Sequence, residues 1–368
     1  MLISLIAAAL AAATPAARAA PASPVVGAPS AAGFAFPYAE GDYVARDFAF
    51  HSGERMAALR LHYTTLGRPH RDKAGRVDNA VMVLHGTGGT GQQFFNPVFA
   101  NELFVPGQPL DITRYYIILP DAIGHGKSSK PSDGLHMRFP KYDYADMVEA
   151  QHRLLVDGLK VTSLRLLMGT SMGCMHDFVW AEAYPGFARA IMPTACLPVE
   201  LAGRNRTWRK LSIDAIEADP AWAGGEYKSP PLAGLRTAAS LSLIAGSAPV
   251  RMQADLPTRA AVEDWLKGRI EKQLDGDAND TIYQLDASRT YDPSAKLETI
   301  TVPVAWVNSA DDFINPFGLG IAEKMVGRMP NATFRLIPES ADTHGHGTHT
   351  WAKFWKADLV ALLARSGG

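Results

Sequence analysis

Ser171 has the surroundings of a nucleophile. It is the middle residue of a Gly-Thr-Ser-Met-Gly segment (residues 169–173), which follows an apolar run and precedes a helical pattern. A serine in such a strand-to-helix turn has a strained backbone that exposes its hydroxyl, and the flanking glycines leave room for the tight crossing of strand and helix. The hydroxyl can then attack a carbonyl carbon, so the segment predicts acyl-transfer chemistry.

A serine hydroxyl attacks well only when a base accepts its proton. We therefore expect an orienting carboxylate and a histidine later in the chain, in that order. Asp311 and Asp312 follow an apolar run at residues 302–307. We favour Asp312, because enzymes with a serine in such a strand-to-helix turn commonly place the carboxylate four residues before a proline, here Pro316. Asp311 remains the alternative.

The base is expected near the C-terminus, in a segment that contains His344, His346 and His349. We favour His346, which lies between two glycines, with His344 as the second choice. The three histidines also resemble the ligand run of metallo-β-lactamase-like hydrolases. That family has an aspartate where this chain has Thr348, and its motif follows an early strand. We therefore predict no metal site.

Two backbone N–H groups should stabilise the negative charge that develops on the attacked carbonyl oxygen. The N–H of Met172, directly after the nucleophile, is the first. A glycine-rich loop at residues 85–91 follows another apolar run. Glycines let a backbone approach a substrate closely, so we assign the second N–H to Thr87 in this loop, with Gly88 as the near alternative.

The same loop contains a Gly-x-Gly-x-x-Gly pattern (residues 86–91), which formally matches a dinucleotide-binding fingerprint. Pro97 and Pro106 interrupt the long helix that the fingerprint requires. We therefore predict no nucleotide and no other cofactor. His125 precedes Ser171 in the chain, and this order favours a structural role for it.

Short β-rich runs alternate with helical patterns, which is typical of an α/β fold with a mostly parallel sheet flanked by helices. Strands are expected at residues 59–63, 80–84, 115–119, 164–168, 190–194, 302–307 and 333–337, and helices at 142–159, 174–183 and 351–364. Residues 198–297 are mostly helical instead. We interpret them as a cap inserted between two parts of the core domain, residues 34–197 and 298–368, where it would wall the substrate site.

The first part of the chain predicts export. Residues 1–20 contain an apolar run and end in the small-residue pattern of an export signal, although no Lys or Arg precedes the run. Residues 21–33, rich in Pro, Ala, Gly and Ser, are expected to form a flexible linker. No later run is long enough for a membrane helix. We therefore expect a periplasmic or secreted protein.

The composition of the chain limits both the partners and the disulfides that can be expected. Lys plus Arg number 36 against 37 for Asp plus Glu, so nucleic acid is not an expected partner. Cys174 and Cys196 are the two cysteines of the chain, too few for a disulfide framework. They are either buried thiols or, after export, one disulfide.

After about residue 43, the chain resembles the homoserine O-acetyltransferase group of α/β-hydrolase-fold proteins. The resemblance lies in the Gly-Thr-Ser-Met-Gly segment, in Ala-Ile-Glu-Ala-Asp-Pro-Ala-Trp (residues 215–222), in Gly-Gly-Glu-Tyr (224–227) and in Gly-Leu (234–235). It implies the α/β-hydrolase fold with an inserted helical cap.

The positions that recognise homoserine in that group differ here. Its arginine near the substrate carboxylate is replaced by Ala239, and the aspartate after its catalytic histidine is replaced by Gly347. An amino-acid substrate would leave its charges unpaired in a buried site, which is unfavourable by several kcal/mol. Acetyl-CoA is also not expected outside the cytoplasm, so water becomes the natural acyl acceptor.

We therefore expect an exported serine hydrolase that cleaves a carboxylic ester, or less readily an amide, with an O-acyltransferase as the alternative. Its partner would be a small ester or acyl substrate, and a homodimer is left open. Aromatic side chains are candidates for an apolar acyl pocket, although aromatic residues are more often part of a core. These candidates are Phe94, Phe95, Trp180 and Trp222.

Overall fold

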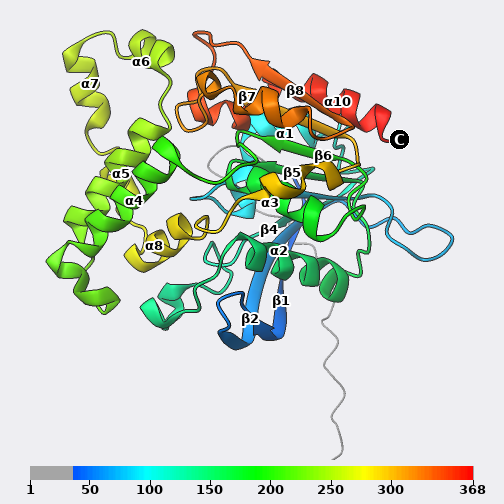
Figure 1. Ribbon diagram of the computed structural model, residues 1–368, viewed down its shortest axis with the longest axis horizontal. Coiled ribbons are helices and arrows are strands. Elements are labelled where there is room, and N and C mark those ends of the chain that lie inside the picture. The colour runs from blue at the N-terminus through cyan, green and yellow to red at the C-terminus, as the bar shows by residue number, and fades with distance from the viewer. Residues whose placement is uncertain (1–35, 368) are drawn as a thin grey trace, which may run out of the picture.

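A computed structural model describes residues 36–367 (Figure 1). The expected export signal (residues 1–20) and linker (residues 21–33) lie outside the described residues. In the part of the chain that is described, no helix combines the length and the apolar character needed to cross a bilayer.

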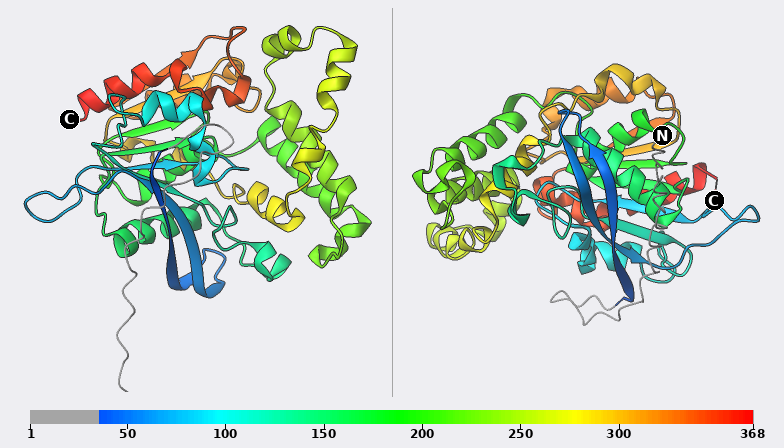
Figure 2. Two further views of the ribbon diagram at one scale, coloured as in Figure 1. Left: turned by 180° about the vertical axis from the view of Figure 1, so that it is seen from behind. Right: turned by 90° about the horizontal axis from the view of Figure 1, so that it is seen from below.

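An eight-stranded sheet with the order β1-β2-β4-β3-β5-β6-β7-β8 organises the protein. The strands from β3 to β8 are parallel, whereas β1 and β2 form an antiparallel ribbon at one edge, dark blue in Figures 1 and 2. The mostly parallel sheet predicted from the sequence is confirmed. The strands are β1 (Tyr38–Ala49), β2 (Arg55–Leu66), β3 (Ala80–Leu84), β4 (Tyr116–Pro120), β5 (Leu166–Thr170), β6 (Ile191–Thr194), β7 (Val304–Ser309) and β8 (Ala332–Ile337).

Helices cover both faces of the sheet, which is why its central strands are buried throughout and mostly apolar. Side chains alternate between the faces: Met82 joins the apolar cluster under α2 and α3, and Val83 joins the cluster under α1 and α10. The flanking helices are α1 (Pro97–Leu103), α2 (Tyr144–Arg153), α3 (Met172–Ala183), α9 (Ile321–Val326) and α10 (Lys356–Arg365).

Each expected strand overlaps an observed one, but β1 has no counterpart among the predictions. Its residues are mostly exposed or half-buried, so no continuous apolar run marks it. Its stability comes from the pairing with β2. The expected helix at residues 142–159 is α2 followed by a π-helical turn, Leu154–Leu159, and the expected helix at 351–364 becomes regular only at α10.

Between β6 and β7 the chain leaves the sheet and forms a group of helices, green to yellow in Figure 1. We call residues 203–286 the helical insertion. It has an apolar cluster of its own, made of Ile213, Ile216, Leu235, Ala238, Ala278, Ile282 and Leu285. Its α-helices are α4 (Gly203–Glu217), α5 (Leu232–Ala245), α6 (Pro249–Asp255), α7 (Arg259–Leu266) and α8 (Ala278–Asp286).

The helical insertion contacts loops that follow the carboxyl ends of the parallel strands. The side chain of Arg209 in α4 donates to Thr87 Oγ1, in the loop after β3, at 3.2 Å. The side chain of Gln284 in α8 donates to the carbonyl oxygen of Gly124, in the loop after β4, at 2.8 Å. Ligands of open α/β sheets bind at this end of the strands, so the insertion borders the place where a site is expected.

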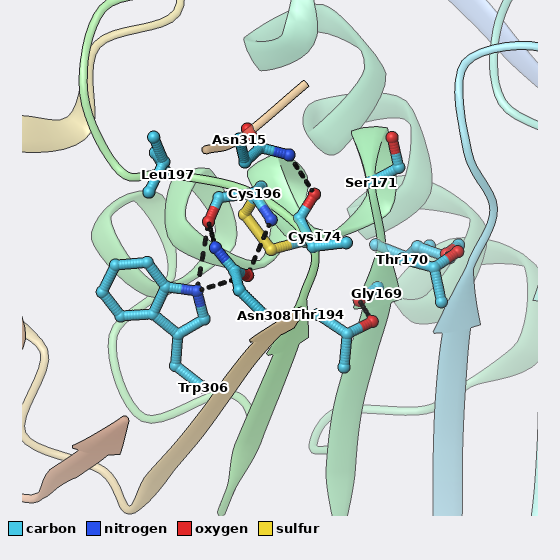
Figure 3. Close-up of a disulfide and its surroundings, with 12 residues drawn as sticks. Gly169, Thr170, Ser171, Cys174, Thr194, Cys196, Leu197, Trp306, Asn308 and Asn315 are labelled. Carbon is cyan, nitrogen blue, oxygen red and sulfur yellow. Dashed lines mark hydrogen bonds between the residues drawn. A yellow bond between two sulfur atoms is a disulfide. The ribbon is translucent and has the colours of Figure 1, made fainter. Parts of the chain in front are cut away.

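A disulfide joins Cys174, in the first turn of α3, to Cys196, just after β6 (Figure 3). Both residues are fully buried. Asn308 holds the Cys196 backbone from both sides, because its side-chain oxygen accepts from the Cys196 N–H and its amide donates to the Cys196 carbonyl. Of the two states that the sequence left open for these cysteines, the structure has the bonded one.

We expect the disulfide to stabilise the fold by about 3 kcal/mol, because it closes a loop with a sequence separation of 22 residues in the unfolded chain. The double variant Cys174→Ala, Cys196→Ala should therefore unfold at a lower urea concentration than the oxidised wild type. Reductant should lower the wild-type midpoint and leave that of the double variant unchanged. A wild type that shows two free thiols after reduction but an unchanged midpoint would contradict this role.

Candidate active site

The backbone at Ser171 is strained. Its φ of 55° and ψ of −108° place it in the left-handed half of conformational space, between the end of β5 and the start of α3. The crossing leaves no room at the flanking glycines: a Cβ at Gly169 would lie 2.1 Å from the Gly173 backbone, and one at Gly173 would lie 2.2 Å from Leu84 O. The Ser171 N–H donates to the Thr194 carbonyl at 2.9 Å, which anchors the turn to β6.

His346 contacts both Ser171 and Asp312. Its Nε2 lies 2.8 Å from Ser171 Oγ, and its Nδ1 lies 2.9 Å from Asp312 Oδ2. When Nδ1–H donates to the carboxylate, Nε2 carries the lone pair and can accept the serine proton. The structure thus brings together the three residues that the sequence analysis selected, from the turn after β5 and the loops after β7 and β8.

The carboxylate of Asp312 is fully buried and well supplied with donors. The backbone N–H groups of Ile314 and Asn315 donate to Oδ1, and the Asn315 side chain donates to Oδ2. Burial by itself raises the pKa of Asp312, but His346 and the Asn315 donors outweigh it and hold that pKa below its ordinary value. Asp312 is therefore an anion that can orient His346.

Asp311, the alternative carboxylate, points elsewhere. Its Oδ2 accepts from Thr343 Oγ1 at 2.8 Å and from the Gly345 N–H at 2.9 Å, and its Oδ1 accepts from Ser309. It therefore ties down the start of the loop that carries His346. The second-choice base, His344, stacks on Trp351 with ring centroids 4.1 Å apart. The geometry favours Asp312 and His346 over both alternatives.

Met172 directly follows the nucleophile, and the loop that contains Thr87 approaches it. Met172 is the first residue of α3, where the helix dipole is positive and the N–H has no partner within the helix. The loop of Thr87 approaches Ser171 closely, since a Cβ at Gly86 would lie 3.5 Å from the Ser171 Cβ. Within residues 36–367, neither the Thr87 N–H nor the Met172 N–H donates to another group.

Thr87 is held by residues to which the sequence analysis gave no catalytic part. His125 Nε2 lies 2.7 Å from the Thr87 carbonyl oxygen, and Arg209 donates to the Thr87 hydroxyl. His125 thus has a structural contact, as its chain order predicts. No local motif marks Arg209, because it lies 122 residues beyond Thr87 in the sequence. Asn315 was also missed, although it lies between Asp312 and Pro316 in the sequence.

Three of the four aromatic residues suggested for an acyl pocket are buried core residues. Phe94 packs on Phe99, and Trp180 donates to the buried side chain of Gln151. Phe94 and Trp180 are each 1% exposed and Phe95 is 7% exposed, too enclosed to contact a substrate. Trp222 is half-buried in the helical insertion and donates to Asn279 at 2.9 Å. The three enclosed residues lie in the core clusters under the sheet, which favours the core interpretation over the acyl pocket for them.

A different cluster could offer metal ligands. In the part of the chain that the structure describes, the side chains of His51, Asp143 and Asp146 come within 4.8 Å of one another. Asp143 and Asp146 are already used as the capping box of α2, where each accepts from backbone N–H groups. The cluster is therefore explained by the start of a helix and carries no assignment here.

Known proteins resemble this chain in sequence and in fold. Homoserine O-acetyltransferase of Solidesulfovibrio magneticus is 36% identical over 201 residues, which is 50% of this chain and 49% of that protein. The chain thus matches about half the length of that relative. An acetylester hydrolase from Corynebacterium glutamicum superposes with a TM-score of 0.77 at 21% identity, over 88% of this chain and 96% of that one.

A second solved structure, homoserine O-acetyltransferase from Bacillus anthracis, gives a TM-score of 0.76 at 19% identity, over 89% of this chain and 97% of that one. At such identities the superpositions show a shared fold. The sequence pattern of the alpha/beta hydrolase fold family matches residues 79–353. That stretch covers most of the chain and contains Ser171, Asp312 and His346, and the protein therefore belongs to the alpha/beta hydrolase fold family.

Proposed function

We propose that this protein is an exported serine hydrolase that cleaves a carboxylic ester through an acyl-enzyme. The observation that carries the proposal is the continuous hydrogen-bonded array from Asp312 through His346 to the strained Ser171, with two free N–H groups beside it. Such an array supports attack on a carbonyl carbon and stabilisation of the negative charge that results. We further propose that the helical insertion acts as the cap that selects the substrate.

The array supports a reaction in two halves. Ser171 Oγ attacks the ester carbonyl while His346 Nε2 takes the hydroxyl proton, and the N–H groups of Thr87 and Met172 hold the oxyanion. When the tetrahedral intermediate collapses, His346 returns the proton to the leaving alcohol and an acyl-enzyme remains. Water then attacks the acyl carbon with His346 as base, which releases the acid and restores Ser171.

Hydrolysis is favoured over transfer by two features. Ala239 and Gly347 stand where homoserine O-acetyltransferases have charged residues for the amino-acid substrate, so this site lacks those partners. The buried Cys174–Cys196 disulfide is typical of an oxidising compartment and supports export, where an acyl-CoA donor is not expected. The likeness to homoserine O-acetyltransferases keeps an O-acyltransferase as the second candidate, because acyl transfer would use the same Ser171, His346 and Asp312.

We expect Ser171→Ala to abolish ester hydrolysis, with kcat at least about 10⁴-fold below the wild type, because it removes the group that forms the acyl-enzyme. The measurement is initial rates on p-nitrophenyl esters of graded acyl length, together with labelling by a fluorophosphonate probe. The exposed Ser242 in α5 provides a matched control, and Ser242→Ala should behave as the wild type. Equal rates for Ser171→Ala and the wild type would remove the assigned nucleophile.

Substitutions of the adjacent residues Asp311 and Asp312 should have different effects, one on stability and the other on kcat. Asp312→Asn is expected to lower kcat about 10⁴-fold with little change in folding, because the amide no longer favours the His346 tautomer with a free Nε2. Asp311→Ala should instead lower the free energy of unfolding by about 1–3 kcal/mol, because it strands the buried donors of Thr343 and Gly345. A larger loss of kcat in folded Asp311→Ala than in Asp312→Asn would reverse the assignment.

The acyl acceptor can be tested directly. We expect the wild type, supplied with an acyl donor and a panel of alcohols, to release mainly free acid, because no charged pair remains for an amino-acid acceptor. The product ratio would be measured by mass spectrometry, first with p-nitrophenyl acetate and then with acetyl-CoA as the donor. Predominant formation of a new ester would favour the O-acyltransferase.

A further inference from the structure

Arg209 brings a buried positive charge to the edge of the candidate active site. It belongs to α4 of the helical insertion and is 2% exposed. Its Nη2 donates to Thr87 Oγ1 at 3.2 Å and its Nε donates to Asn205 Oδ1 at 3.1 Å. The guanidinium therefore crosses from the insertion to the loop whose N–H group is assigned to the oxyanion.

This charge has no counter-ion in the described part of the chain. Arg209 forms no ion pair with a carboxylate there, and its Nη1 is enclosed without a hydrogen-bond acceptor. The ionisable groups beside it are the neutral phenol of Tyr144, which also interacts with it as a hydrogen-bonding group, and a second cation, Arg206, which repels it. A buried charge without a partner is strongly unfavourable in a resting protein.

The other basic residues of the same helix each have a counter-ion or are exposed, although the Nη1 of Arg206 also lacks an acceptor. Arg206 pairs with Asp286 at 3.2 Å, Lys210 pairs with Asp214, and Arg204 is exposed and stacks on Phe313. A basic helix face alone therefore does not explain Arg209. Its distinguishing feature is the contact with Thr87.

The enclosure of Nη1 limits what this charge can do. Nη1 has essentially no accessible surface, so an anionic part of a substrate could not contact it directly. The electrostatic field of the guanidinium needs no direct contact. In a protein interior that excludes water, this field is stronger than it would be in water. The negative charge nearest to Thr87 during the proposed reaction is the oxyanion on the attacked carbonyl.

We propose that Arg209 is a positioning residue of the oxyanion hole. It fixes the Thr87 loop from the helical insertion and places an uncompensated positive charge behind the oxyanion as that charge forms. This inference rests on the proposed ester hydrolysis. Thr87 is then held on two sides, by His125 at its carbonyl oxygen and by Arg209 at its hydroxyl. The position of the insertion would thereby set the strength of the oxyanion hole.

The test compares Arg209→Met, Arg209→Lys and Thr87→Val with the wild type, and Lys210→Met serves as a matched control on the same helix. Thr87→Val removes the hydroxyl contact but keeps the charge and the backbone N–H. For each variant, kcat and KM are measured with p-nitrophenyl acetate. The Ki of a trifluoromethyl ketone is also measured, because its adduct with Ser171 carries an oxyanion. Thermal unfolding reports whether each variant is folded.

We expect Arg209→Met to lower kcat about 10- to 100-fold and to raise the Ki of the ketone by a similar factor, with KM changed less than about 3-fold. Arg209→Lys should recover part of both losses, because it keeps a positive charge. Thr87→Val should lose less than Arg209→Met, and Lys210→Met should match the wild type. A purely structural role would change unfolding and leave kcat and the ketone Ki of the folded variants unchanged.

Several results would overturn the inference. They are an Arg209→Met variant with wild-type kcat and ketone affinity, an Arg209→Lys variant as impaired as Arg209→Met, and a loss confined to KM. If Arg209→Met does not fold, Arg209→Lys and Thr87→Val still decide the matter by the same ketone measurement. Fluorophosphonate labelling of the wild type distinguishes a wrong role for Arg209 from a wrong proposed function. A wild type that is neither labelled nor active contradicts both, whereas a labelled and active one with unaffected Arg209 variants contradicts only the role of Arg209.

Discussion

Where β5 passes into α3, Gly169 has no room for a Cβ against the start of α3, and Gly173 has none against Leu84 at the end of β3. This crossing forces Ser171 into a conformation that most residues avoid, with φ at 55°. The strain is held because Ser171 donates to β6 and the adjacent Gly173 donates to the end of β3, at His85 O. The contact of Gly173 with β3 brings the start of α3 beside the loop of Thr87, so the nucleophile and both candidate oxyanion donors depend on these two close contacts.

The other candidate residues come from loops that would be free to move if they were not tied. Asp311 anchors the His346 loop, and Asn315 bridges Asp312 to the carbonyl oxygen of Ala195. Ala195 precedes Cys196, whose disulfide returns to the first turn of α3 behind Ser171 (Figure 3). The supports of the carboxylate and of the nucleophile thus form one connected network. This network explains how residues 175 positions apart in the sequence meet at 2.8 Å.

Local features of the sequence predicted much of this arrangement. The Ser171 turn, the glycine loop at Thr87 and the buried parallel strands each leave a short-range pattern, because each is imposed by local backbone geometry or by burial on two faces. The choice between Asp311 and Asp312 had only the spacing to Pro316 to support it, whereas in the structure it depends on the contacts of Asp311 with Thr343 and of Asp312 with Asn315. Residue type alone could not decide whether Phe94 and Trp180 line a pocket or fill the core, because an aromatic side chain suits both places, and the structure buries both residues. Arg209 could not be found from sequence, because its meaning arises only when α4 folds back onto Thr87.

The contact between α4 and Thr87 limits where the helical insertion can lie relative to the core. A helical insertion that only covered a site could shift with little effect on chemistry, since the core would still hold Ser171, His346 and Asp312. Here the insertion also contributes a buried guanidinium that donates to the hydroxyl of Thr87 and interacts with the phenol of Tyr144 in the core. The desolvation of that charge penalises any placement of α4 in which it gains neither solvent nor a partner. The geometry of the insertion is therefore constrained by the electrostatics of the contact between Arg209 and the Thr87 loop.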